Sequence, residues 1–231
     1  MGTLKSFIWF AGCVAVSSVM SAQSESEAGL GMGRLISSRF SFRYDGAMKV
    51  EQARAMLELL EEEFTRISAE IGCRFPGERI EVSLQSRENY LRTSGAAEWS
   101  AGVFDGRIRV SIQSPAQTRA TAAHELVHAC LASTGDWPAW LHEGLAQKLS
   151  GQIVSEARRK RVRGGGFPKL AQMNQTFAGM SAENASVAYA AAAMAVDLFY
   201  EYYRDMGVAN LVRSPERLPA IAEDLDRKLR Q

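Results

Sequence analysis

The chain has 231 residues, of which 46% are hydrophobic and 23% are charged, and this composition excludes a fibrous or intrinsically disordered protein. Its 27 basic and 26 acidic residues give a net charge of +1. So balanced a charge gives no support to a nucleic-acid partner.

The first 22 residues have the pattern of a secretory signal peptide. Lys5 is followed by an apolar run over residues 7–16 and then by the small-residue stretch SSVMSA. This run is too short and too weakly flanked for a stable membrane span, so we expect cleavage near Ala22 and a periplasmic or secreted protein. Lipid anchoring at Cys13 is an alternative, but Phe10 is a poor first residue for a lipoprotein box.

Residues 23–35 begin with small, polar and acidic residues and are expected to form a flexible tether. Residues 36–231 are expected to form a single domain. The first elements of this domain follow from apolar spacing and turn residues. The predicted elements are a strand at 39–44, a long amphipathic helix at 48–71, a strand at 78–84 and a hairpin at 102–113 that turns at Asp105-Gly106.

Helices dominate the rest of the chain. Ser114-Pro115 and Asp136-Trp137-Pro138 are typical helix starts. The predicted helices cover 115–133, 136–149, 185–206 (ended by Gly207) and 218–229, and residues 158–166 look like a charged helix end passing into a loop. Strands and a helix followed by mostly helices indicate an α+β fold with a small N-terminal sheet.

Three histidines, His124, His128 and His142, are the only ones in the chain. The first two are four residues apart on the predicted helix, so both side chains lie on one face and can reach one metal ion. Glu125 lies beside His124, where its carboxylate can approach a water molecule bound to the same ion. This is the H-E-x-x-H pattern of zinc peptidases.

A catalytic zinc ion takes three protein ligands and leaves a fourth position for water. Leu131 and Thr134 stand where metzincins have glycine and histidine, which excludes that arrangement. Instead, the stretch WPAWLHEGLA begins a second helix after a glycine turn, and this helix can bring the Glu143 carboxylate back over the first helix.

The combination of HELVH with W-L-x-E-G-x-A resembles the gluzincin metallopeptidases, and among them the small peptidase MA-like branch. The resemblance implies a zincin-like fold with a mixed sheet, and one Zn²⁺ per chain held by His124, His128 and Glu143. It also implies that Glu125 is the general base, and it suggests Tyr189, on the alanine-rich helix, as the donor that stabilises the oxyanion.

Two residues near the second motif remain open. His142 is the rival of Glu143 for the third ligand position, but it points about 100° away on the helix and is expected to be a pocket or surface residue. Gln147 stands where thermolysin-like enzymes have an acid that holds a zinc histidine, and its side-chain oxygen could accept the ring N–H in the same way.

The sequence leaves alternatives open for two further features. Cys73 and Cys130 form either one disulfide, which would stabilise the protein by about 3–4 kcal/mol, or two buried thiols. The second strand of the hairpin, residues 107–113, is expected to be an edge strand that pairs with an extended peptide. Its Arg107 and Arg109 either favour acidic substrate groups or only protect the edge.

The sequence therefore predicts an exported zinc metallopeptidase that acts on a peptide or protein substrate. A metal-carrying scaffold that recognises a peptide without cleaving it is a second hypothesis, although Glu125 would then have no role. A third is an amidase that uses the same zinc chemistry on cell-wall peptides.

Overall fold

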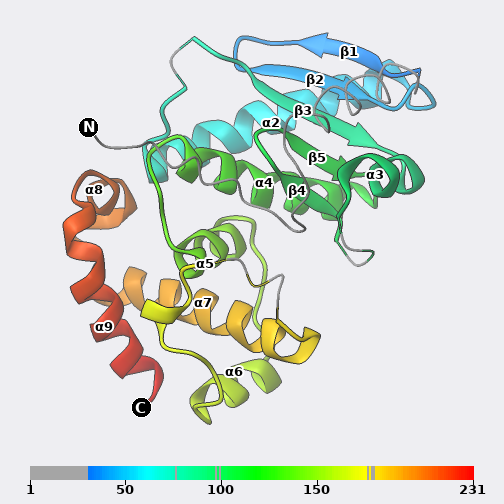
Figure 1. Cartoon of the computed structure of the whole chain (residues 1–231). Helices are drawn as coiled ribbons and strands as arrows, with labels where there is room; N and C mark the ends of the chain where they lie inside the picture. Colours follow the sequence, from blue (N-terminus) through cyan, green and yellow to red (C-terminus); the bar gives the residue numbers. More distant parts are fainter. Residues whose placement is uncertain (1–30, 76, 97, 99, 176, 178–179) are drawn as a thin grey trace, which may run out of the picture.

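The computed structural model describes residues 31–75, 77–96, 98, 100–175, 177 and 180–231. The expected signal peptide, Cys13 and most of the expected tether lie outside these residues. The described part has the expected α+β fold: a mixed sheet with a long helix in the N-terminal half and a helical C-terminal half (Figure 1).

Five strands in the described residues form one sheet in the order β1-β2-β3-β5-β4. The strands are β1 (Gly33–Ile36), β2 (Phe40–Tyr44), β3 (Ile80–Gln85), β4 (Gly102–Phe104) and β5 (Ile108–Ser111). The central pairs β2–β3 and β3–β5 are parallel, whereas β1 and β4 are antiparallel edge strands. Residues 107–113 were therefore wrongly expected to form the edge strand, because β5 lies inside the sheet and β4 lies at its edge.

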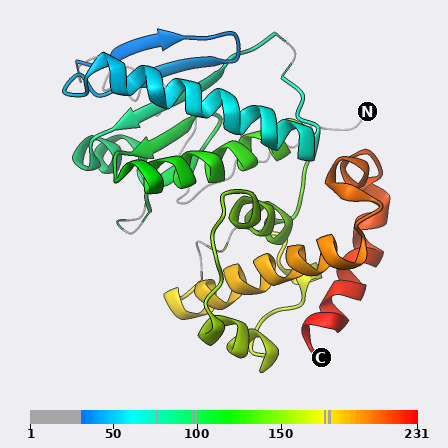
Figure 2. The same ribbon diagram turned by 180° about the vertical axis from the view of Figure 1, so that it is seen from behind.

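Two long helices cover one face of the sheet. Figure 2 shows α2 (Val50–Ile71) and α4 (Pro115–Ala132) side by side in front of the strands. Phe40, Phe42 and Val82 alternate with polar residues along β2 and β3 and are buried in the core. The period-two pattern therefore places the apolar side chains on one face of the sheet, where α2 and α4 cover them.

The remaining helices form the second half of the molecule, below the sheet in Figure 1. They are α5 (Ala139–Leu149), α6 (Glu156–Arg163), α7 (Ala182–Tyr202), α8 (Gly207–Arg213) and α9 (Leu218–Leu229). The described residues also include the helix α3 (Arg87–Ser94) and the short 3-10 turns η1 (Leu170–Gln172) and η3 (Pro215–Arg217). α5 packs closely on α7, because a Cβ at Gly144 would lie 2.4 Å from the Ala192 carbonyl oxygen.

Several boundaries differ from those predicted. β1 includes residues 33–35, which were assigned to the tether, and it pairs with β2. The hairpin turn has three residues, because Phe104 pairs with Ile108. Gly106, in the middle of the turn, has a left-handed φ of +96°. Gly207 does not end α7. Instead, α7 starts earlier, where Ser181 caps it, and Gly207 begins α8.

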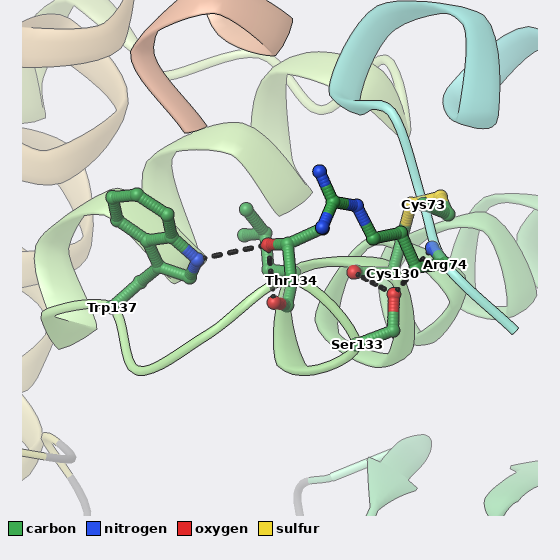
Figure 3. Close-up of a disulfide and its surroundings, with 7 residues drawn as sticks. Cys73, Arg74, Cys130, Ser133, Thr134 and Trp137 are labelled. Carbon is green, nitrogen blue, oxygen red and sulfur yellow. Dashed lines mark hydrogen bonds between the residues drawn. A yellow bond between two sulfur atoms is a disulfide. The ribbon is translucent and has the colours of Figure 1, made fainter. Parts of the chain in front are cut away.

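Cys73 and Cys130 form a disulfide, which decides between the two alternatives left open by the sequence (Figure 3). Cys73 follows the end of α2 and Cys130 lies on α4, with their Cα atoms 5.0 Å apart. Disulfides persist in oxidising compartments, so this bond suggests an extracytoplasmic location. Among the described residues, no helix is both long enough and apolar enough to span a membrane.

Candidate metal centre

His124, His128 and Glu143 converge in the structure. The two histidines lie one turn apart on α4, and Glu143 lies on α5, which packs against α4. Oε2 of Glu143 is 3.5 Å from Nε2 of His124 and 3.8 Å from Nε2 of His128. The possible ligand atoms of the three residues all lie within 4.8 Å of one another, so this group could hold a metal ion in a zincin-like arrangement.

The spacing of these atoms fits a small divalent cation. Two atoms that each lie about 2.1 Å from a tetrahedral zinc ion are about 3.4 Å apart. Moreover, Oε2 of Glu143 is buried and accepts no hydrogen bond from the described residues. A buried carboxylate oxygen without a partner is unfavourable unless a cation or a donor compensates it, and two imidazole nitrogens at this distance are suitable further ligands.

The electrostatics of the three residues are those of a buried cluster. Burial would raise the pKa of Glu143, but His128 and His124 outweigh burial and lower it. Burial likewise opposes protonation of His124, yet the carboxylates of Glu143 and Glu125 raise its pKa. The pKa of His128 falls to about 3, mainly because of burial. His128 is therefore neutral near pH 7, which is the form that binds metals.

Glu125 lies beside this cluster and is almost fully buried, with 6% of its surface exposed. Burial raises its pKa to about 7, and the charges of Glu143 and Asp105 contribute to the rise. The edge strand β4 passes directly over this side chain: a Cβ at Gly102 would lie 2.7 Å from Oε1 of Glu125. Gly102 thus allows the backbone of β4 to approach the carboxylate.

The third histidine is not part of the group that could hold a metal ion. His142 is 2% exposed, and its Nδ1 lies 3.3 Å from Nδ1 of His128. Burial lowers the pKa of His142 to about 3. His142 is therefore not a surface residue, because its side chain is buried in contact with the candidate ligand His128.

The contacts of Gln147 differ from the one that the sequence left open. Its amide nitrogen donates to the carbonyl oxygens of Glu143 and Tyr189, at 3.1 and 2.9 Å, and thereby ties α5 to α7. The residue in contact with His124 is instead Gln152, whose Nε2 lies 3.2 Å from Nδ1 of the ring. Gln152 could not be predicted from the sequence, because it follows the end of α5 and belongs to no recognisable motif.

Tyr189 lies on α7 near both carboxylates. The pKa of its hydroxyl group is raised by burial and further by the charges of Glu143 and Glu125. Its ring packs edge-on against Phe177, with the ring centroids 5.1 Å apart. The hydroxyl group therefore belongs to the electrostatic environment of the candidate metal centre.

Arg109 cannot contact a substrate, contrary to one of the two sequence interpretations. Its side chain is fully buried and forms a 2.5 Å ion pair with Asp105. The charge of Asp105 is one of those that raise the pKa of Glu125. Arg109 thus belongs to the interior beside the site.

No protein-family model matches the chain, and no curated protein matches it in a sequence search.

Proposed function

We propose that this protein is an exported zinc metallopeptidase of gluzincin type, made of a signal peptide (1–22), a tether and a single domain. The observation that carries the proposal is the convergence of His124, His128 and Glu143 on one point with Glu125 beside them. The H-E-x-x-H spacing on α4 and the W-L-x-E-G-x-A motif on α5 support it.

The residues of the chain have distinct roles in this proposal. His124, His128 and Glu143 hold Zn²⁺, which when bound lowers the pKa of a coordinated water molecule and polarises the scissile carbonyl group. Glu125 accepts the proton of the attacking water and delivers it to the leaving amine. Tyr189 donates a hydrogen bond to the oxygen on which negative charge develops.

The position of the edge strand β4 favours a peptide, and not a small molecule, as the substrate. Its outer side has no neighbouring strand in the described sheet, and Gly102 on this strand lies against Glu125. An extended peptide that paired with β4 would therefore pass next to the general base.

The test compares wild type with Glu125→Gln, measuring zinc content and cleavage of a diverse peptide mixture. We expect both proteins to bind about one zinc ion per chain. We also expect cleavage to fall by about 100-fold or more in the variant. Glu58→Gln, an exposed position on α2, is the matched control.

Three other outcomes would contradict the proposal. Equal zinc-dependent cleavage by wild type and Glu125→Gln would remove Glu125 from the mechanism. Zinc binding by both without cleavage by either would favour the scaffold. Cleavage restricted to cell-wall peptides would favour the amidase.

A further inference from the structure

Each candidate ligand histidine has a partner at the ring nitrogen that faces away from Glu143. The Nε2 atoms of His124 and His128 face Oε2 of Glu143. The opposite atom, Nδ1, lies 3.2 Å from the Gln152 amide in His124 and 3.3 Å from Nδ1 of His142 in His128. Each ring thus turns one nitrogen toward Glu143 and has a polar partner at the other nitrogen.

A partner at Nδ1 determines which nitrogen can bind a metal. A neutral imidazole carries one proton, and Nε2 binds a cation only when this proton is on Nδ1. The partner of Nδ1 must then accept a hydrogen bond. Nδ1 of a neutral His142 has a lone pair for this purpose, and the amide oxygen of Gln152 can take the place of its nitrogen by a half-turn of the amide group.

The two partners differ in burial. His142 is 2% exposed, whereas Gln152 is exposed to solvent. Water can replace Gln152 as an acceptor but has little access to the contact between His128 and His142, so the loss of His142 leaves a buried N–H without this acceptor. The backbone of His142 is anchored in the first turn of α5, where its N–H donates to the Pro138 carbonyl oxygen at 3.2 Å.

We propose that His142 is a positioning residue that holds His128 in the tautomer and orientation required for metal binding, and that Gln152 does the same more weakly for His124. The inference rests on the proposed zinc site and deepens it. It also explains why all three histidines of the chain are close together: two bind the metal and the third orients one of them. The helix that supplies the third ligand, α5, supplies this orienting residue from the adjacent position.

The test measures the zinc affinity of the purified full chain by competition with a chromophoric chelator. In His142→Asn the side-chain oxygen can occupy the position of Nδ1, so we expect an affinity close to that of wild type. His142→Leu has a similar size but no acceptor, and we expect its affinity to fall by about 10–100-fold. We expect a loss of less than about tenfold for Gln152→Ala, because water can replace the amide.

The matched variants separate positioning from a merely structural role. The melting temperature of each metal-free protein is measured in parallel, and a purely structural His142 would lower it without changing the zinc affinity of the folded protein. If His142→Leu does not fold, His142→Gln replaces it, because the longer amide reaches the position of Nε2 instead of Nδ1. We expect the same loss of affinity for this variant.

The inference would be overturned if His142→Leu bound zinc as tightly as wild type. It would also be overturned if His142→Asn bound zinc as weakly as His142→Leu. These outcomes do not depend on catalysis. A wild type that bound zinc tightly but cleaved no peptide would contradict the proposed function alone, and the affinities of the variants would still decide the role of His142.

Discussion

Gly102 determines how closely the edge strand β4 approaches Glu125. A Cβ at this position would lie 2.7 Å from Oε1 and 2.9 Å from Cγ of Glu125, and 2.6 Å from Cγ2 of Thr121. Real Cβ contacts are longer than this, so either the carboxylate or the strand would have to move. The position of the proposed general base therefore depends on a residue without a side chain.

We expect Gly102→Ala to reduce peptide cleavage by about 100-fold while one zinc ion per chain is still bound, because a displacement of about 1 Å of a catalytic group has an effect of this size. Cleavage rates and zinc content are measured together. Gly166→Ala is the control, since a Cβ at Gly166 meets no atom within 4 Å. Full activity of Gly102→Ala would show that Glu125 does not need this close approach.

Residue types and spacing predicted the group that could hold a metal ion but not the contacts around it. His124 and His128 could be found because a spacing of four residues puts both on one face of a helix, and Glu143 because the motif W-L-x-E-G-x-A marks it on the next helix. Gln152 could not be found, because it follows the end of α5 and its contact with His124 depends on how the chain leaves that helix. The link that Gln147 makes between α5 and α7 could not be found either, because its amide nitrogen donates to backbone carbonyl oxygens that become neighbours only when the helices pack.

At the scale of elements, one carboxylate connects the two helices that cover the sheet. Glu63 on α2 accepts hydrogen bonds from Arg66, 2.6 Å away on the same helix, and from Arg119 on α4, 2.8 Å away. Arg66 also donates to the carbonyl oxygen of Leu149 at the end of α5. The two helices that carry the candidate ligands are thus both attached to α2.

Stability should depend on pH through Glu63. Burial would raise its pKa, but the hydrogen bonds and charges of Arg66 and Arg119 lower it below the ordinary value of 4.5. A carboxyl group whose pKa is lower in the folded state than in the unfolded chain contributes its full stabilisation at pH values above the pKa of the unfolded chain. This stabilisation is lost as the pH falls through the folded value.

We therefore expect Glu63→Gln to lower the free energy of unfolding at pH 7 by about 1–2 kcal/mol, a modest value because both arginines are half exposed. The difference from wild type should shrink as the pH falls below about 4.5. Urea unfolding of both proteins at several pH values measures this difference in the free energy of unfolding. A difference that stayed constant down to pH values well below the folded pKa would exclude the ionised carboxylate as the cause.

Periodicity and capping predicted most elements, and the exceptions have physical reasons. The terminal helix Leu218–Leu229 was predicted with its observed bounds because apolar residues recur at helical spacing. β1 was missed because only four residues form it and pairing with β2 stabilises it. α3 and α8 were missed because they have only eight and seven residues and depend on tertiary packing.

At the scale of the whole molecule, the sheet and the helical half meet at the turn between α4 and α5. In Figure 3 the disulfide lies close to this turn. Ser133 donates to the Cys130 carbonyl oxygen and accepts from the backbone of Arg74, while Trp137 donates to Thr134. The disulfide and these hydrogen bonds together fix the angle at which α5 leaves α4 and brings Glu143 to the histidines.

We expect reduction of the disulfide to lower the free energy of unfolding by about 3–4 kcal/mol, because it frees a loop with a sequence separation of 57 residues in the unfolded chain. Denaturation with and without a thiol reductant measures the effect. The double variant Cys73→Ala/Cys130→Ala should be as unstable as the reduced wild type and insensitive to reductant. Unchanged stability of the wild type after complete reduction would contradict this expectation.

The fold class follows from the order of the elements, but the arrangement of the strands does not. Neither the parallel pairing of β2, β3 and β5 nor the position of β4 at the edge can be read from periodicity, because both depend on how the helices cross over the sheet. The close approach of Gly102 to Glu125 follows from the position of β4 in this arrangement.

The most direct test of the central claim is the zinc content of wild type and Glu143→Ala after dialysis against a buffer with limiting free zinc. We expect about one zinc ion per chain for wild type and for the control Glu58→Ala, and almost none for Glu143→Ala, because only two protein ligands remain. Wild-type zinc content in Glu143→Ala would show that Glu143 is not a ligand and would overturn the proposed zinc site.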